Sequence, residues 1–321
     1  MNQSLIRAAA SAAALLVMPS LAAAEVRVVA SVKPIHSLVA SIMQGAGEPA
    51  LIVGGAASPH TYSLKPSDAQ KLEDADVVFW IGHDFEAFLD KPLEALPGDA
   101  KVVALGEAPG LVELPFREGG PFEAHDDGDH EDHAAEASSE TEHHDDHEHG
   151  GVDMHLWLNP MNAKAMAAEI RDTLVVADPA NADIYRKNTE TLDAQLDALD
   201  KEITATVEPV KDKPFVVFHD AYQYFENRYH VRVAGSVTVS PETMPGAERL
   251  SVIQAKIGEL GAACVFAEPQ FEPKLLNVVT EGTTARSGVL DPEGGALTAG
   301  PALYGDLLRA IATSLTECLS R

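Results

Sequence analysis

Residues 125–149 hold the densest group of possible metal ligands in the sequence. Seven of the chain's 13 histidines lie there: His125, His130, His133, His143, His144, His147 and His149. Twelve Asp or Glu residues, and no Lys or Arg, lie in the surrounding stretch 121–150. Neutral imidazole is a good zinc ligand and carboxylates attract the cation, so the run predicts repeated, weak zinc binding. The alternative is a solvated acidic spacer, which would not need histidine.

The same stretch, 121–150, is poor in large apolar residues and has no hydrophobic period. Such a segment cannot bury enough surface to offset its chain entropy, which predicts a disordered loop. A flexible loop does not hold one ion in a fixed geometry. A specific metal site is therefore expected on rigid elements elsewhere in the chain.

Four other residues lie beside predicted strands or motifs and could form that site. His60 follows the second predicted strand, and His219 and Asp291 each come directly after a later one. His155 opens a short apolar segment ahead of Pro160. In parallel sheets, ligands gather outside the carboxyl ends of the strands. A single histidine is more often structural, so it is their shared position that favours a metal site.

The elements that would hold these residues alternate between strand and helix. Short β-branched runs predict strands at 26–31, 50–53, 77–81, 101–104, 215–218, 231–235, 263–267 and 287–290. Helical patterns lie at 34–43, 66–74, 85–96, 221–228, 247–260, 273–283 and 301–319. This alternation predicts an α/β fold with two lobes, each a parallel sheet flanked by helices.

A long, rigid helix is expected to join the two lobes. Asp178 can cap it, Pro179 suits its first turn, and apolar residues recur at spacings of three and four from Leu192 to Ile203. The alternative is a pair of shorter helices. The predicted organisation is a signal peptide at 1–24, an N-terminal lobe at 25–177, a linker helix at 178–208 and a C-terminal lobe at 209–321.

The first 24 residues have the features of an export signal. Arg7 precedes an apolar run at 8–21, and Ala22 to Ala24 offer a small-residue cleavage site. The run has about 14 residues, whereas a membrane span needs roughly 20. The mature chain is thus expected outside the cytoplasm. A formal net charge of −27 argues against nucleic acid or an anionic membrane as partner and favours a cation.

The chain has only two cysteines, Cys264 and Cys318. In an oxidising compartment, one disulfide between them is the default expectation. A thiolate metal site is the alternative, but it would need more sulfur than two residues supply.

Five motifs together carry a family resemblance. They are SPHTYSLKPSD at 58–68, DMHLWLNP at 153–160, VVFHDAY at 216–222, FAEPQF at 266–271 and LDP at 290–292. In this order the chain resembles the substrate-binding proteins of ABC transporters for zinc and manganese, most closely the ZnuA-type zinc-uptake proteins. The resemblance covers nearly the whole mature chain, and an acidic histidine loop ahead of the second ligand is typical of the zinc branch.

The resemblance implies a ligand set in a cleft between the lobes, formed by His60, His155 and His219. Asp291 matches the aspartate that completes the site in some relatives, with water as the alternative fourth ligand. Because Pro59 precedes His60, the neighbouring glutamate of other relatives is absent. Glu268 matches a position near the cleft that is expected to support the ligands without binding the ion.

The ligand types and the resemblance also indicate metal and partner. Manganese relatives usually carry a carboxylate at the position of His219, and imidazole suits zinc better. The resemblance implies a periplasmic monomer that delivers zinc to the membrane permease of an ABC transporter, with the histidine-rich loop assisting acquisition. A zinc hydrolase and an extracellular zinc-binding adhesin are the alternatives. The sequence has no His-Glu-x-x-His motif, so we expect no enzyme activity.

Overall fold

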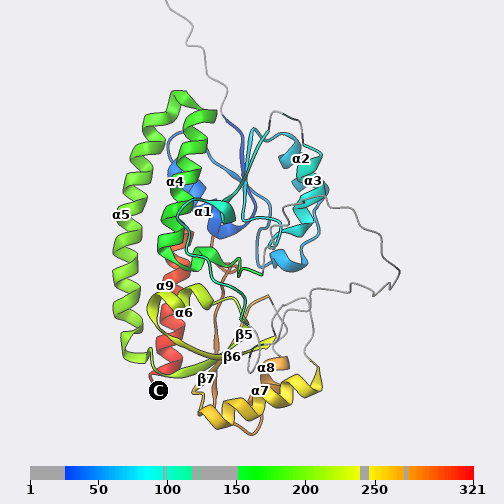
Figure 1. The fold of residues 1–321 in the computed structure, drawn as a ribbon, viewed down its shortest axis with the longest axis vertical. Helices are drawn as coiled ribbons and strands as arrows, with labels where there is room; N and C mark the ends of the chain where they lie inside the picture. Colours follow the sequence, from blue (N-terminus) through cyan, green and yellow to red (C-terminus); the bar gives the residue numbers. More distant parts are fainter. Residues whose placement is uncertain are drawn as a thin grey trace, which may run out of the picture.

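The computed structural model describes residues 26–96, 98, 100–117, 122, 151–238, 246–270 and 274–321. The predicted signal peptide at 1–24 and the seven histidines of 125–149 lie outside the described residues. Within the described part, two four-stranded sheets lie one above the other along the longest axis, and one long helix runs beside both (Figure 1). No helix in that part is long and apolar enough to span a bilayer.

The first sheet has the order β2-β1-β3-β4, and all of its pairs are parallel. Its strands are β1 (Val28–Ala30), β2 (Ala50–Leu51), β3 (Val77–Trp80) and β4 (Lys101–Ala104). The helices of this lobe are α1 (Lys33–Met43), α2 (Pro66–Glu73), α3 (Asp90–Glu94) and α4 (Pro160–Ala177). The central strands β1 and β3 are almost wholly buried, which explains their unbroken apolar sequences.

The second sheet repeats this arrangement with the order β6-β5-β7-β8, again all parallel. Its strands are β5 (Pro214–His219), β6 (Arg232–Thr238), β7 (Cys264–Ala267) and β8 (Arg286–Val289). Its helices are α6 (Gln223–Tyr229), α7 (Ala247–Leu260), α8 (Lys274–Thr280) and α9 (Leu303–Leu319). The predicted α/β fold with two parallel sheets is thus confirmed.

Two helices differ from the sequence expectation. The helix predicted at 85–96 is present but shorter: it begins with a 3-10 turn at Ala87–Leu89 and continues as α3, which ends at Glu94. Glu86 has a non-helical backbone, and its buried carboxylate accepts hydrogen bonds from the amides of Ile81 and Gly82. Helix α4 was not predicted, although Asn159 caps it by accepting a hydrogen bond from the amide of Met161.

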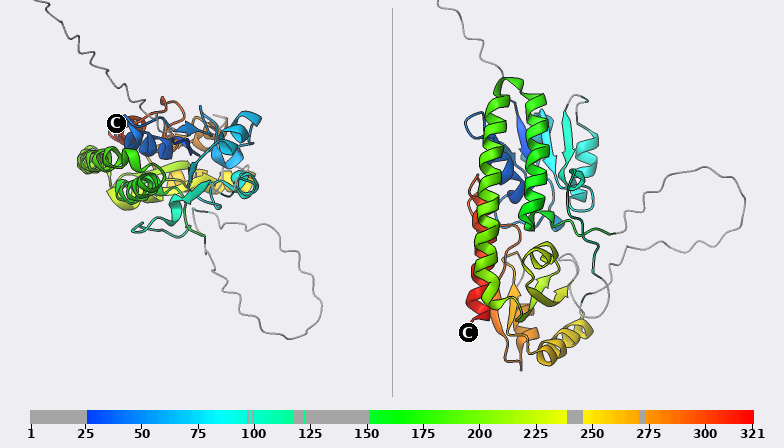
Figure 2. Two further views of the ribbon diagram at one scale, coloured as in Figure 1. Left: turned by 90° about the horizontal axis from the view of Figure 1, so that it is seen from above. Right: turned by 60° about the vertical axis from the view of Figure 1, so that its left-hand side comes forward.

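The long helix is α5 (Ala182–Val207), a single helix of 26 residues that follows a 3-10 turn at Pro179–Asn181. At 1.5 Å per residue it extends about 39 Å. Its buried stripe includes Leu192, Leu196 and Ile203, and it contacts α1 and α4 of the first lobe and α9 of the second. Figure 2 shows it running the length of both lobes. The predicted long linker helix is therefore present, unbroken.

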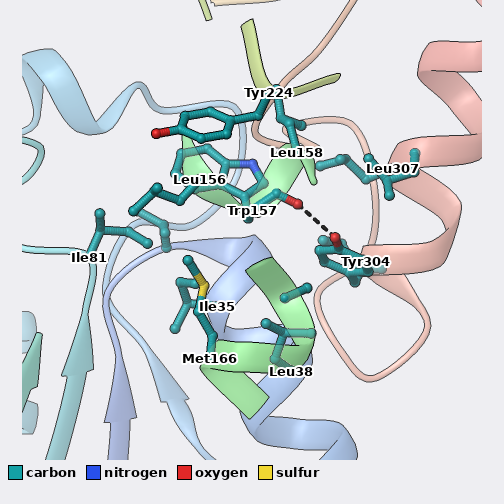
Figure 3. Packing of buried hydrophobic residues seen from close by; sticks show 14 of the residues in the cluster. Ile35, Leu38, Ile81, Leu156, Trp157, Leu158, Met166, Tyr224, Tyr304 and Leu307 are labelled. Carbon is teal, nitrogen blue, oxygen red and sulfur yellow. Dashed lines mark hydrogen bonds between the residues drawn. The ribbon is translucent and has the colours of Figure 1, made fainter. Parts of the chain in front are cut away.

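The two lobes share one hydrophobic core as well as a helix. A single cluster of buried residues extends from β1 to the end of α9. Within it, the Tyr304 hydroxyl donates to the carbonyl of Trp157 at 2.6 Å (Figure 3), and the Trp157 indole N–H donates to the carbonyl of Pro292 at 2.8 Å. Lys33 donates to the carbonyls of Gly294 (3.0 Å), Gly295 (2.8 Å) and Leu297 (2.9 Å). A movement between the lobes would have to break this packing.

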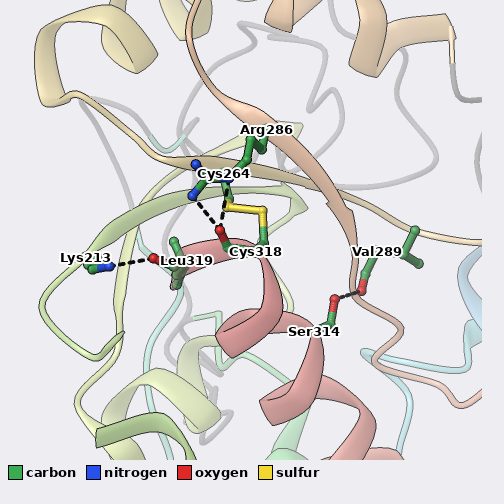
Figure 4. Close-up of a disulfide and its surroundings, with 7 residues drawn as sticks. All are labelled: Lys213, Cys264, Arg286, Val289, Ser314, Cys318 and Leu319. Carbon is green, nitrogen blue, oxygen red and sulfur yellow. Dashed lines mark hydrogen bonds between the residues drawn. A yellow bond between two sulfur atoms is a disulfide. The ribbon is translucent and has the colours of Figure 1, made fainter. Parts of the chain in front are cut away.

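The predicted disulfide is present between Cys264 of β7 and Cys318 of α9 (Figure 4). Around it, Arg286 donates to the carbonyl of Cys318 and Lys213 to the carbonyl of Leu319. These contacts fix the end of α9 on the second sheet, and α9 in turn packs on α5 and α1.

Replacing both cysteines, Cys264→Ser with Cys318→Ser, should lower the free energy of unfolding by about 4 kcal/mol, because the bond closes a loop of 54 residues in the unfolded chain. Urea unfolding of both proteins without added metal measures the difference. A reductant is the control: it should destabilise the wild type and leave the double variant unchanged. Equal stability of the two oxidised proteins would contradict the expectation.

Candidate metal centre

Three histidines from three separate elements meet between the sheets. His60 lies on a 3-10 turn at Pro59–Thr61, His155 begins a 3-10 turn at Leu156–Leu158, and His219 is the last residue of β5. One ligand nitrogen from each lies within 4.8 Å of the other two. His219 lies at the carboxyl end of a strand, as the sequence predicts. His60 instead lies on a turn, nine residues beyond the end of β2.

Buried carboxylates set the orientation of two of these rings. Nδ1 of His155 lies 2.8 Å from Oδ1 of Asp153, and Nδ1 of His219 lies 2.6 Å from Oε1 of Glu268. A carboxylate accepts, so each Nδ1 carries the proton and each Nε2 is left with a lone pair. Glu268 thus contacts the predicted ligand His219 directly. Asp153, which is not among the predicted site residues, makes the equivalent contact with His155.

The ligand nitrogens of the three rings lie close together. The Nε2 atoms of His155 and His219 are 3.3 Å apart, and Nε2 of His60 is buried without a hydrogen-bond partner among the described residues. Two lone pairs facing each other at this distance repel unless a proton or a cation lies between them. Three convergent imidazole nitrogens with an open position are a suitable donor set for Zn²⁺.

The electrostatic environment differs between the three histidines. Burial, helped by the neighbouring imidazoles, lowers the pKa of His60 and His155 well below the ordinary value, so both are neutral near pH 7. Burial acts in the same direction on His219, but the carboxylates of Glu268, Asp220 and Asp153 together outweigh it and raise the pKa of His219. A proton at the centre is therefore held mainly on His219.

An aromatic wall encloses the centre on one side. The ring of Phe85, which is buried, lies edge-on at 4.9 Å from His60, 5.4 Å from His155 and 5.1 Å from Trp157. This packing limits ring rotation and water access. The sequence predicts that Phe85 begins a helix. In the structure the helical segment begins at Ala87, after Glu86, whose backbone is not helical.

Asp291 lies outside this group of converging atoms. Its Oδ1 accepts from the side-chain amide of Gln270 at 3.0 Å and from the backbone amide of Glu293 at 3.1 Å, and its Oδ2 faces the amide of Ala296 at 3.4 Å. The structure thus brings together three of the four predicted ligands, and Asp291 is held by other contacts. The seven loop histidines lie outside the described residues.

Comparison with known proteins gives relatives over almost the whole chain. The ZnuA family model, described as zinc-uptake complex component A, periplasmic, matches residues 28–318. The high-affinity zinc uptake system protein ZnuA of Brucella suis is 55% identical over 316 residues, which cover 94% of each chain. The protein of the same name from Yersinia pestis is 38% identical over 98% of each chain.

Solved structures show the same fold. The periplasmic zinc binding protein TroA from Treponema pallidum has a TM-score of 0.74 at 20% identity, covering 92% of this chain and 100% of that one. A 138–173 deletion mutant of ZnuA with zinc bound has a TM-score of 0.72 at 23% identity, covering 92% and 98%. Given the family match over residues 28–318 and the 55% identity to a curated relative, this chain belongs to the ZnuA family of periplasmic zinc-uptake components.

Proposed function

We propose that the protein captures Zn²⁺ in the periplasm and delivers it to the membrane permease of a zinc ABC transporter. The observation that carries the proposal is the convergence of three imidazole nitrogens, two of them with Nδ1 held by a buried carboxylate. The names of the relatives, which are zinc uptake proteins, support the same cargo, and the description of the family as periplasmic supports the compartment. A monomer would be sufficient for this role.

The ligands proposed for the ion are His60, His155 and His219, with water or Asp291 in the fourth position. In the present geometry water is favoured, because protein groups already hold both Asp291 oxygens. Imidazole nitrogen favours zinc over manganese, which prefers carboxylate, carbonyl and water oxygens.

The histidine-rich run 125–149 has a separate part in the proposal. Its imidazoles would bind further zinc weakly and raise the local zinc concentration near the centre, as a short tether does for any attached ligand.

Each of the variants His60→Ala, His155→Ala and His219→Ala should weaken tight zinc binding by more than about 100-fold, because it removes a direct ligand and not only an outer contact. Titration against a competing chelator measures the affinity. His83→Ala is the matched control, since His83 is mostly exposed and contacts Asp90 instead of the centre. Tight binding retained in all three ligand variants would contradict the assignment.

Zinc affinity should fall as the pH drops, starting above pH 6.5. Nε2 must be free of its proton to bind the ion, and the pKa of His219 is raised. Binding is therefore strongest above that pKa and is lost as pH falls through it. Because the pKa values of His60 and His155 are lowered, protons compete with zinc at these two histidines only at more acidic pH.

Chelator titrations between pH 8 and 5 measure this dependence, with about tenfold weaker binding per pH unit for each proton that competes. The variant Glu268→Gln is the control: it should move the onset to lower pH, because the carboxylate that raises the pKa of His219 is gone. A zinc affinity that did not change between pH 7.5 and 5 would exclude histidine ligands.

Deleting 121–150 should leave one tight zinc equivalent and remove the weaker ones, because the proposed ligands lie on elements outside that stretch. Isothermal titration of both proteins gives the stoichiometry. A full-length variant with all seven histidines of 125–149 changed to Ser keeps the acidic residues and separates imidazole binding from charge. Loss of the tight equivalent in both proteins would move the main site into the run.

A further inference from the structure

Two segments from either side of the histidine-rich run pair with each other in the first lobe. We call residues 112–117 and 151–155 the stem. Within it, the amide of Phe116 donates to the carbonyl of Gly151 at 2.7 Å and the amide of Asp153 donates to the carbonyl of Leu114 at 3.0 Å. The second segment of the stem includes Asp153 and ends at His155, so its position fixes one of the proposed ligands and the carboxylate that orients it.

One arginine of the stem reaches across to the second lobe. Nε of Arg117 donates to Oδ2 of Asp220 at 3.0 Å, and its two terminal nitrogens contact the other Asp220 oxygen and a carboxylate oxygen of Glu226. The three side chains are largely buried, with exposed fractions of 19%, 11% and 23%. Asp220 directly follows His219, so the contact lies one residue from the ligand supplied by β5.

Neighbouring hydrogen bonds also link α6 to the stem, close to His155. The side-chain amide of Gln223 donates to the carbonyl of Pro115 at 2.9 Å and lies 3.5 Å from Oδ2 of Asp153. The hydroxyl of Tyr224 accepts from the amide of Leu114 at 3.0 Å. The stem and the start of α6 thus form one hydrogen-bonded unit that includes Asp153, which orients His155, and that reaches Asp220, the residue directly after His219.

An electrostatic role and a positioning role for Arg117 predict opposite changes in zinc affinity when its side chain is removed. A cation beside the centre repels Zn²⁺, so a purely electrostatic role predicts tighter zinc binding when the guanidinium is removed. A guanidinium that holds two carboxylates in a fork fixes distance and angle as well as charge. If that geometry is what matters, its removal lets His155 and His219 drift apart and weakens binding. The sign of the change in affinity therefore separates the two roles.

We propose that Arg117 is a positioning residue for zinc capture, which joins the stem to Asp220 and Glu226 so that His155 and His219 stay at the spacing the ion requires. The inference rests on the proposed zinc-binding function of the three histidines. In this role Arg117 contacts neither the ion nor a ligand ring. It belongs to the first lobe, whereas His219, the nearest ligand along the chain to its partner Asp220, belongs to the second.

The test compares zinc affinity and zinc dissociation rate in Arg117→Met, Arg117→Lys and wild type, by chelator competition and stopped-flow release. Arg117→Met should bind zinc about 10-fold more weakly, at the low end of effects seen for outer-shell residues, and release it faster. Arg117→Lys keeps the charge but cannot contact both carboxylates as a fork, so it should lie between Met and wild type.

Arg228→Met is the matched control. Arg228 makes a similar two-nitrogen contact with Asp200, but it joins α6 to α5 and does not contact the stem. It should bind zinc like the wild type. Zinc binding by Arg117→Met as tight as or tighter than wild type, or an equal loss in Arg228→Met, would overturn the inference. Failure of wild type and Arg228→Met to bind zinc would instead refute the proposed function itself.

Discussion

The short distance between two imidazole nitrogens is the constraint on which the centre depends. Nε2 of His155 and Nε2 of His219 lie 3.3 Å apart, in a place where both rings are buried. The Nδ1–H of each ring donates a hydrogen bond to a carboxylate, so neither ring can turn this N–H towards the other without losing that partner. A cation between the rings removes the repulsion, and the same geometry that is unfavourable without it becomes favourable with it.

The supporting carboxylates strengthen this preference for a cation. Burial raises the pKa of Asp153 to about 6 and also raises the pKa of Glu268, so ionising either one costs free energy in the absence of nearby positive charge. A divalent ion on the histidines supplies that charge through the ring. Binding therefore draws protons away from the centre and leaves the neutral imidazoles of His155 and His219 each between an ionised carboxylate and the ion, the arrangement in which outer contacts tune a metal site.

Such a centre needs two lobes that keep a constant distance, because its ligands come from both. The buried stripe of α5, the shared core and the hydrogen bonds of Trp157 and Tyr304 join the lobes along one side. The disulfide fixes α9 to the second sheet while α9 packs on α1 of the first lobe. The contacts between the stem and α6 add polar links close to the ligands. Rigidity is thus distributed over apolar packing, one covalent bond and a few buried polar contacts.

Much of the architecture follows from local patterns in the sequence. Alternating β-branched runs and helical periods, a proline at a helix start and two cysteines in an exported chain were enough to predict both sheets, α5 and the disulfide. These features depend on neighbours a few residues apart or on simple counting. Histidine type and motif order also singled out the three residues that the fold brings together.

Only the tertiary structure decided how those residues are supported. Glu268 orients a histidine 49 positions away, and Arg117 contacts a carboxylate 103 positions away, distances over which no period or propensity acts. The helix expected at 85–96 likewise begins only at residue 87, because the packing of Phe85 and the contacts of Glu86 with two backbone amides outweigh helix propensity at these two residues. The three histidines could be singled out from the sequence, whereas their protonation, spacing and partners depend on which side chains the fold places within hydrogen-bond distance.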